Sequence, residues 1–134
     1  MIKDIPQLYV DDIGIAITKE INEELGEEWN AYFVNFKHVP VNGVLVASTG
    51  YGSINGVEKK TSTLRHFLNV VHGRTAVKIE PVMEDVFSIN NEYWASFYHN
   101  GNLYDKKYVF EANTIDVSKF EFIEVLGLEG ILIM

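Results

Sequence analysis

Residues 59–78 read KKTSTLRHFLNVVHGRTAVK, and the fold that the sequence predicts depends on this stretch. Its apolar side chains recur at the i, i+3, i+4, i+7 spacing of an amphipathic helix. Hydroxyl residues that can cap a helix precede them, and Gly73 stands where a helix often ends. We therefore predict one amphipathic helix over residues 62–72, with the apolar side chains buried and Arg65 and His66 turned to its margins or to solvent. The four side chains expected to be buried are Leu64, Phe67, Leu68 and Val71.

The same stretch is basic in an acidic chain. It holds five of the eleven Lys and Arg residues, two of the four His and no acid, while the whole chain has a net charge of −8. Hydroxyls and free backbone N–H groups at a helix N-terminus, close to positive side chains, are typical of an anion site. The predicted site for an anion or an acidic partner consists of Lys59, Lys60, Thr61, Ser62, Thr63, Arg65 and His66. The alternative is that the hydroxyls only cap the helix and that the positive side chains meet acidic strands of the same fold or of a second subunit.

Most of the remaining chain has the patterns of β-strands. Ile13, Ile15 and Ile17 alternate with small or polar residues, which is the period of a half-buried strand. A helix over residues 13–25 is the alternative, because isoleucine and leucine also recur there every four residues. Residues 29–36 are apolar on both faces and indicate a return strand.

Three turn signals divide these strands. Pro40-Val41-Asn42-Gly43 predicts a chain reversal, and Asn55-Gly56 and Asn100-Gly101 predict two-residue hairpins. The second signal places Tyr51 opposite Lys60. The third places Tyr93 opposite Tyr108 on an inward aromatic face and Trp94 opposite Lys107 on the other face, where a cation–π contact can form.

The later segments complete the predicted architecture. Residues 75–80 indicate a strand that stops at Pro81, residues 84–87 one helical turn, and residues 131–134 part of a closing strand. We therefore predict an α+β domain made mostly of antiparallel hairpins, with one helix packed across the sheet. The length and even composition indicate that residues 1–134 form a single domain.

Composition excludes several classes of function. A chain with a charge of −8 repels nucleic-acid backbones over most of its surface, which argues against a nucleic-acid partner. It has no cysteine, no apolar run near the ~20 residues of a spanning helix, and no basic and apolar leader at its start, so we expect a cytoplasmic protein without a membrane partner. His66 and His72 are too far apart around a helix to bind one metal ion, and no motif implies a cofactor.

Four segments carry a resemblance to a known group of proteins. They are Trp29-Asn30-Ala31-Tyr32, residues 60–66, Asn91-Glu92-Tyr93-Trp94 and Tyr104-Asp105-Lys106-Lys107. Together they resemble an uncharacterised family of small Bacteroidetes proteins, and the likeness covers most of the chain. Relatives sometimes carry the label of a phenylalanyl-tRNA synthetase alpha subunit, but this chain looks much too short for a class II catalytic domain. The resemblance implies no activity, ligand or site residue.

Three functional hypotheses follow from these patterns. The first is a non-enzymatic binding or adaptor module that uses the basic stretch to meet an anion or an acidic surface. The second is a small enzyme with His66 as general base beside Ser62 or Thr61 and with Glu80 or Asp85 as a possible carboxylate. It requires a pocket and a carboxylate within hydrogen-bond reach of the imidazole. The third is a structural homo-oligomer without a ligand. The non-enzymatic hypothesis is preferred because no motif fixes a reaction.

Overall fold

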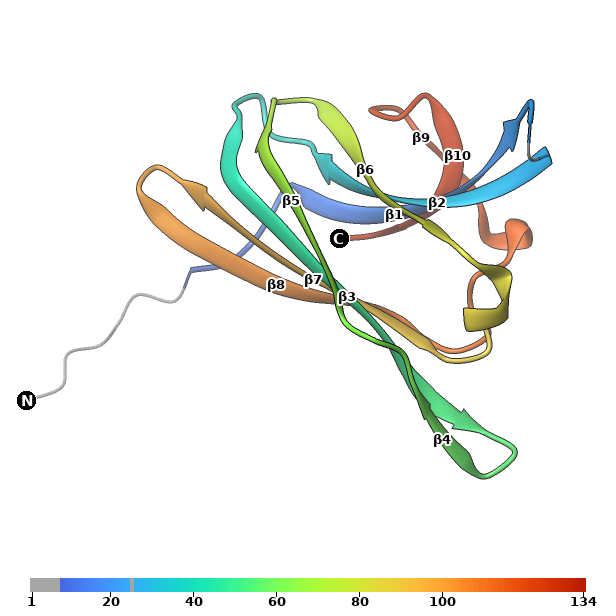
Figure 1. Ribbon diagram of the computed structural model, residues 1–134. Helices are drawn as coiled ribbons and strands as arrows, with labels where there is room; N and C mark the ends of the chain where they lie inside the picture. The colour runs from blue at the N-terminus through green and yellow to red at the C-terminus, as the bar shows by residue number, and fades with distance from the viewer. Residues whose placement is uncertain (1–7, 25) are drawn as a thin grey trace, which may run out of the picture.

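The computed structural model describes residues 8–24 and 26–134, and these form two antiparallel five-stranded sheets (Figure 1). The described residues include no α-helix and only two 3₁₀ turns, η1 (Glu84–Val86) and η2 (Val117–Lys119). The predicted α+β class is therefore wrong, and the protein is all-β.

Sheet A is built from both ends of the described chain. Its strand order is β6-β2-β1-β10-β9, with every neighbouring pair antiparallel. The bounds are β1 Ile13–Asn22, β2 Gly26–Asn35, β6 Thr75–Val82, β9 Glu121–Ile123 and β10 Leu128–Ile133.

Sheet B is organised around its longest strand, β3. Its order is β4-β3-β7-β8, and β5 also pairs with β3. One edge of β3 pairs with β7, and its other edge pairs first with β5 and then with β4. The hairpin of β3 and β4 extends beyond the other strands (Figure 1). The bounds are β3 Val41–Ile54, β4 Val57–Lys60, β5 Leu64–Val71, β7 Asn90–His99 and β8 Asn102–Phe110.

The segment predicted as a helix over residues 62–72 contains strand β5. Leu64 and Phe67, which the helix would bury, are 53% and 66% exposed. Asn69 has a positive φ of 61°, and the pairing of β5 with β3 shifts register beside it. Because both faces of the strand carry apolar residues and the irregularity at Asn69 breaks the alternation, the spacing imitates that of a helix.

The core fills the space between the inner faces of the two sheets. The ring of Phe33 in β2 meets that of Phe97 in β7 at 6.2 Å between centroids. The buried Tyr108 hydroxyl in β8 donates to the Ile13 carbonyl in β1 at 2.9 Å. Side chains from both sheets thus share one hydrophobic cluster.

Several of the predicted strands and hairpins are confirmed. Residues from Ile13 onward form β1 rather than a helix, and both two-residue hairpins have positive φ at each turn residue, as a type I′ turn requires. Tyr51 pairs with Lys60, Tyr93 with Tyr108 and Trp94 with Lys107, whose ammonium lies 5.9 Å from the Trp94 ring centroid.

Two turn predictions are wrong. The Pro40–Gly43 signal does not join paired strands, because β2 pairs with β1 and β6, and Asn42 and Gly43 lie at an irregularity inside β3. Pro81 does not end its strand, since β6 continues to Val82. β6 lies at an edge of sheet A, where the missing N–H of a proline is tolerated.

None of the helical segments in residues 8–24 and 26–134 has the length and apolar character needed to cross a membrane.

Candidate functional site

The seven residues predicted as an anion site do not surround a helix N-terminus. Lys59 and Lys60 are exposed in the β4 hairpin, while Arg65 and His66 belong to β5. Arg65 lies on the outer face of sheet B, since it pairs with Ala47, and His66 on the inner face, since it pairs with the buried Val46. The helix on which this prediction depended is therefore absent, and its positive side chains are divided between opposite faces.

The three hydroxyl residues join β4 to β5 and link this connection to β3. The Thr61 amide donates to the Gly50 carbonyl, and the Gly50 amide donates back to Thr61 Oγ1, both at 2.8 Å. Thr63 Oγ1 lies 2.8 Å from Thr49 Oγ1. Ser62 lines the cavity described below. Thr61 and Thr63 thus hold β3 and the start of β5 together.

Part of the basic stretch contacts acids of the same chain. Arg74, directly before β6, lies 3.8 Å from Glu124 in the turn between β9 and β10. Lys78 of β6 lies 3.7 Å from Glu28 of the neighbouring strand β2. Within the described residues, no acid lies at ion-pair distance from the other three basic side chains, Lys59, Lys60 and Arg65. The binding of an anion or an acidic partner by these three stays a prediction.

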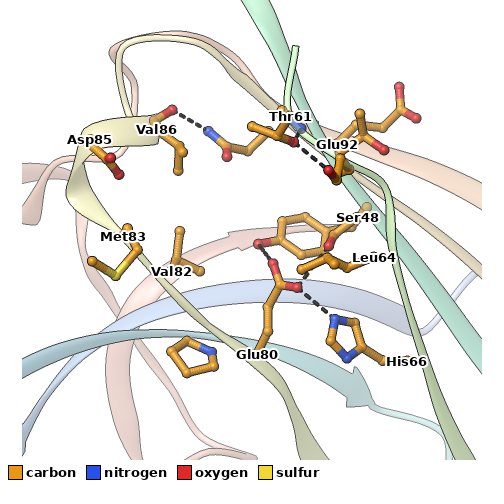
Figure 2. A pocket seen from close by; sticks show the side chains of 16 residues that line it. Ser48, Thr61, Leu64, His66, Glu80, Val82, Met83, Asp85, Val86 and Glu92 are labelled. Atoms are coloured by element: carbon orange, nitrogen blue, oxygen red, sulfur yellow. Dashed lines mark hydrogen bonds and ion pairs between the residues drawn. The ribbon is translucent and has the colours of Figure 1, made fainter.

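His66 is hydrogen-bonded to Glu80 of β6, whose carboxylate accepts three side-chain hydrogen bonds. Its Oε1 accepts from His66 Nε2 at 2.7 Å and from Ser48 Oγ at 2.8 Å, and its Oε2 accepts from the Tyr93 hydroxyl at 3.2 Å (Figure 2). The three donors come from β5, β3 and β7. This carboxylate therefore connects sheet A to three strands of sheet B.

A β-bulge places Glu80 on the inner face. Ala31 pairs with Glu80, but the next residue, Tyr32, pairs with Lys78, so β6 carries one extra residue at Ile79. Without the bulge, regular alternation would put Glu80, two positions after Lys78, on the same outer face as Lys78. The bulge instead turns the carboxylate toward His66 and Tyr93.

Burial and a hydrogen bond keep the Tyr93 phenol protonated beside Glu80. Tyr93 is 1% exposed, and burial together with the negative charge of Glu80 raises the pKa of its phenol far above the ordinary value. The phenol therefore keeps its proton and donates a hydrogen bond to Glu80. A carboxylate only accepts hydrogen bonds, so His66 Nε2 is the donor when Glu80 is ionised, and Nδ1 of that neutral tautomer is then an acceptor.

These polar groups line an open cavity of about 520 Å³. The volume falls within the roughly 300–1,000 Å³ range of small-molecule sites. Apolar side chains of β5, β6 and η1 form much of the wall: Leu64, Pro81, Val82, Met83 and Val86. Among the described residues that line it there is no Lys or Arg, but there are three acids: Glu80, the half-buried Glu92 and the exposed Asp85. The cavity therefore has a largely apolar wall and, at its inner end, a negative group that can accept hydrogen bonds.

The geometry supports only part of the serine–histidine arrangement. His66 has the carboxylate partner and the cavity that an acid–base site requires, but they lie at a strand rather than at a helix start. Ser48 donates to Glu80, and the described contacts include no hydrogen bond from Ser62 to His66. In the parts of the chain that the structure describes, no group of three or more His, Cys, Asp or Glu could hold a metal ion.

The sequence pointed to His66 and Ser62 and offered Glu80 as one of two possible carboxylates, but it did not indicate the roles of Ser48 and Tyr93. The inward position of Tyr93 follows from its hairpin, and this could have been used. The position of Glu80 depends on a bulge that no local residue pattern marks.

Comparison with known proteins gives no family for this chain: no family model, no curated protein and no solved structure matches it.

Proposed function

We propose that this protein is a small binding module whose cavity between β5 and β6 takes a compact apolar ligand with a protonated amine or another hydrogen-bond donor. The observation that carries the proposal is the Glu80 carboxylate, which three donors from three strands hold at the inner wall of the cavity. We further infer a cytoplasmic protein, a setting that the cysteine-free composition fits.

The charge of the cavity supports a donor or a cation over an anion. Its polar interior contains Glu80, which is hydrogen-bonded to His66, and Asp85 and Glu92 add two more acids to the lining. An anion entering this space would lose its hydration without gaining a positive partner. An alkylammonium group would instead gain a charge-assisted hydrogen bond, and its chain would cover the apolar wall.

Hexylamine, hexanol and hexanoate test this proposal, because they share one chain and differ in the head group. We expect hexylamine to shift the backbone amide NMR signals of residues 64–66, 80 and 82–86, hexanol to shift them less, and hexanoate to leave them unchanged. Glu80→Gln should weaken hexylamine binding about tenfold or more, since the ligand loses a charged acceptor.

Glu20→Gln is the matched control, because Glu20 also accepts three side-chain hydrogen bonds but lies outside the cavity lining. It should leave hexylamine binding unchanged. Equal shifts with hexanoate, or binding that is unaffected by Glu80→Gln, would reject the proposal.

The His66–Glu80 contact favours a second function, general acid–base catalysis. A carboxylate on Nε2 orients the imidazole and leaves Nδ1 to accept a proton from a water that attacks a substrate. Hydrolysis of p-nitrophenyl acetate tests it: the protein should exceed the buffer rate, and His66→Gln should remove the excess. His72→Gln, which changes an exposed histidine directly after the same strand, should keep the excess rate. A rate indifferent to His66→Gln rules this function out.

A further inference from the structure

The outer face of sheet B carries a patch of apolar side chains that no other part of the described chain covers. It is formed by β5, β3, β7 and β8, in that order across the sheet. Five large apolar side chains on it are more than a third exposed: Leu45 37%, Phe67 66%, Trp94 46%, Tyr98 50% and Leu103 51%. Aromatic residues in such a cluster are typical of the centre of a protein–protein interface.

The strand register arranges the middle of this face into two adjacent rows. The first, the Leu45 row, runs across the strands as Phe67, Leu45, Ser96 and Asp105. The second, the Trp94 row, runs as Arg65, Ala47, Trp94 and Lys107. Each residue of one row lies two positions along its strand from its counterpart in the other row, on the same face.

The charges of the two rows complement each other. At the β8 end, the Leu45 row has Asp105 and the Trp94 row has Lys107. At the β5 end, the Leu45 row has the ring of Phe67 and the Trp94 row has Arg65. An acid therefore faces a base, and an aromatic ring faces a guanidinium, when one row is laid on the other. A face of this kind is complementary to itself.

We propose that this outer face binds a second copy of the chain, with a two-fold axis that lies across the strands between the Leu45 row and the Trp94 row. The axis places the Leu45 row of each copy on the Trp94 row of the other. Asp105 then meets Lys107 of the other copy, Phe67 meets Arg65 and Leu45 meets Ala47. Each contact occurs twice, as an isologous interface requires.

The other symmetric arrangement is disfavoured by charge. A two-fold axis along the strands would lay β5 on β8 within the same row, so that Arg65 would face Lys107 and Phe67 would face Asp105. Like charges placed directly opposite each other destabilise an interface. Of these two axes, the one across the strands combines the apolar cluster with paired opposite charges.

The size of the face fits a reversible dimer. With ~4.8 Å between strands and ~3.4 Å per residue, four strands and the eight steps from Tyr98 to Asn90 span about 19 Å by 27 Å. That is about 500 Å² before side-chain relief is added, against about 800 Å² of accessible surface per partner in a standard interface. Two sheets packed face to face about 10 Å apart would cover it.

Sedimentation velocity, at protein concentrations from low micromolar to submillimolar, tests whether the outer face of sheet B forms a dimer. We expect a monomer–dimer equilibrium that Phe67→Ser shifts to monomer. Phe122→Ser is the matched control, because Phe122 is also 66% exposed but belongs to β9 of sheet A, and it should leave the dimer intact. A protein that stays monomeric throughout, or a dimer that Phe67→Ser does not weaken, overturns the proposal.

Charge exchange tests the axis. Asp105→Lys places lysine against Lys107, and Lys107→Asp places aspartate against Asp105, so each variant alone should weaken the dimer about tenfold or more. The double variant should recover it. A mixture of the two single variants should form a heterodimer, because every exchanged contact then pairs opposite charges. If the mixture stays monomeric while the wild type dimerises, the proposed axis is wrong.

Discussion

The Tyr93 hydroxyl shows how much one buried hydrogen bond of the Glu80 cluster contributes. Tyr93→Phe keeps the ring in the core but removes one of the three donors to the carboxylate. We expect the free energy of unfolding to fall by about 1–2 kcal/mol, since a bond to a charged acceptor is lost. Tyr98→Phe makes the same change at a half-exposed position of the same strand and should cost less than about 0.5 kcal/mol. Urea unfolding measures both, and equal losses would show that Tyr93 donates no stabilising bond.

Glu20 makes stability depend on pH in the acid range. Burial acts to raise its pKa, but hydrogen bonds from Tyr32, Asn30 and Thr18 and the charge of Lys78 outweigh burial and hold the pKa below the ordinary 4.5. A carboxyl group with a lowered folded-state pKa stabilises the protein above its unfolded-state pKa, and this contribution is lost as pH falls through the folded-state pKa.

Glu20→Gln should therefore lower stability near neutral pH, and the gap to the wild type should narrow as pH falls below about 4.5. Thermal unfolding at a series of pH values measures the gap. Glu129→Gln, which changes an exposed acid of β10, gives the comparison, and the gap should be smaller there. A gap between Glu20→Gln and the wild type that widens toward acid pH would contradict the assignment.

At the level of single residues, the sequence identified His66 but not its partner. The candidate site requires Glu80 to face inward, and the bulge at Ile79 decides that direction. A bulge depends on how β6 pairs with β2, which is distant in sequence. Local alternation alone places Glu80 on the solvent face beside Lys78. The sequence therefore allowed Glu80 as one possible partner of His66, but it could not predict that the two side chains meet.

At the level of elements, the turn between β5 and β6 depends on Gly73. A Cβ atom there would lie 2.5 Å from the His38 carbonyl carbon and 2.6 Å from the Val39 amide nitrogen. Asn35 secures the same region by donating to the carbonyls of Val39, Val71 and His72. The turn thus packs directly on the backbone of the β2–β3 connection.

Gly73→Ala should destabilise the protein by about 1–3 kcal/mol, because backbone atoms must move to admit the methyl group. Gly56→Ala is the comparison: its turn has a φ of +77° but open space, so only the left-handed backbone conformation costs energy, about 1 kcal/mol. Thermal unfolding ranks the two. A smaller loss for Gly73→Ala than for Gly56→Ala would contradict the close packing.

Gly73 also explains why the predicted helix was wrong. A glycine at the end of an apolar run is typical of a helix C-terminus, but here the same glycine permits a close backbone approach between two strand connections. The hairpins at Asn55-Gly56 and Asn100-Gly101 were predictable because their signal is local. The strand conformation of residues 64–71 was not predictable, because pairing with β3 overrides the helical spacing of their apolar side chains.

At the level of the whole molecule, the two sheets share one core rather than forming two units. Phe33 and Phe97 meet across it, and the Tyr108 hydroxyl bonds to the backbone of Ile13. Neither sheet can lose its partner without exposing this apolar surface to water. The predicted single domain should therefore unfold as one cooperative unit.

Phe97→Leu tests this cooperativity, because it changes a sheet B side chain that contacts Phe33 of sheet A. It should cost about 1–3 kcal/mol, since an aromatic contact is lost and a small cavity is left. The two tryptophans report on different sheets, Trp29 in β2 and Trp94 in β7. Urea unfolding followed by fluorescence in Trp94→Phe and Trp29→Phe backgrounds should give the same shift in stability on adding Phe97→Leu. If the substitution lowers the midpoint reported by Trp94 and leaves the one reported by Trp29 in place, the sheets unfold separately, and a shared core does not explain the stability of this fold.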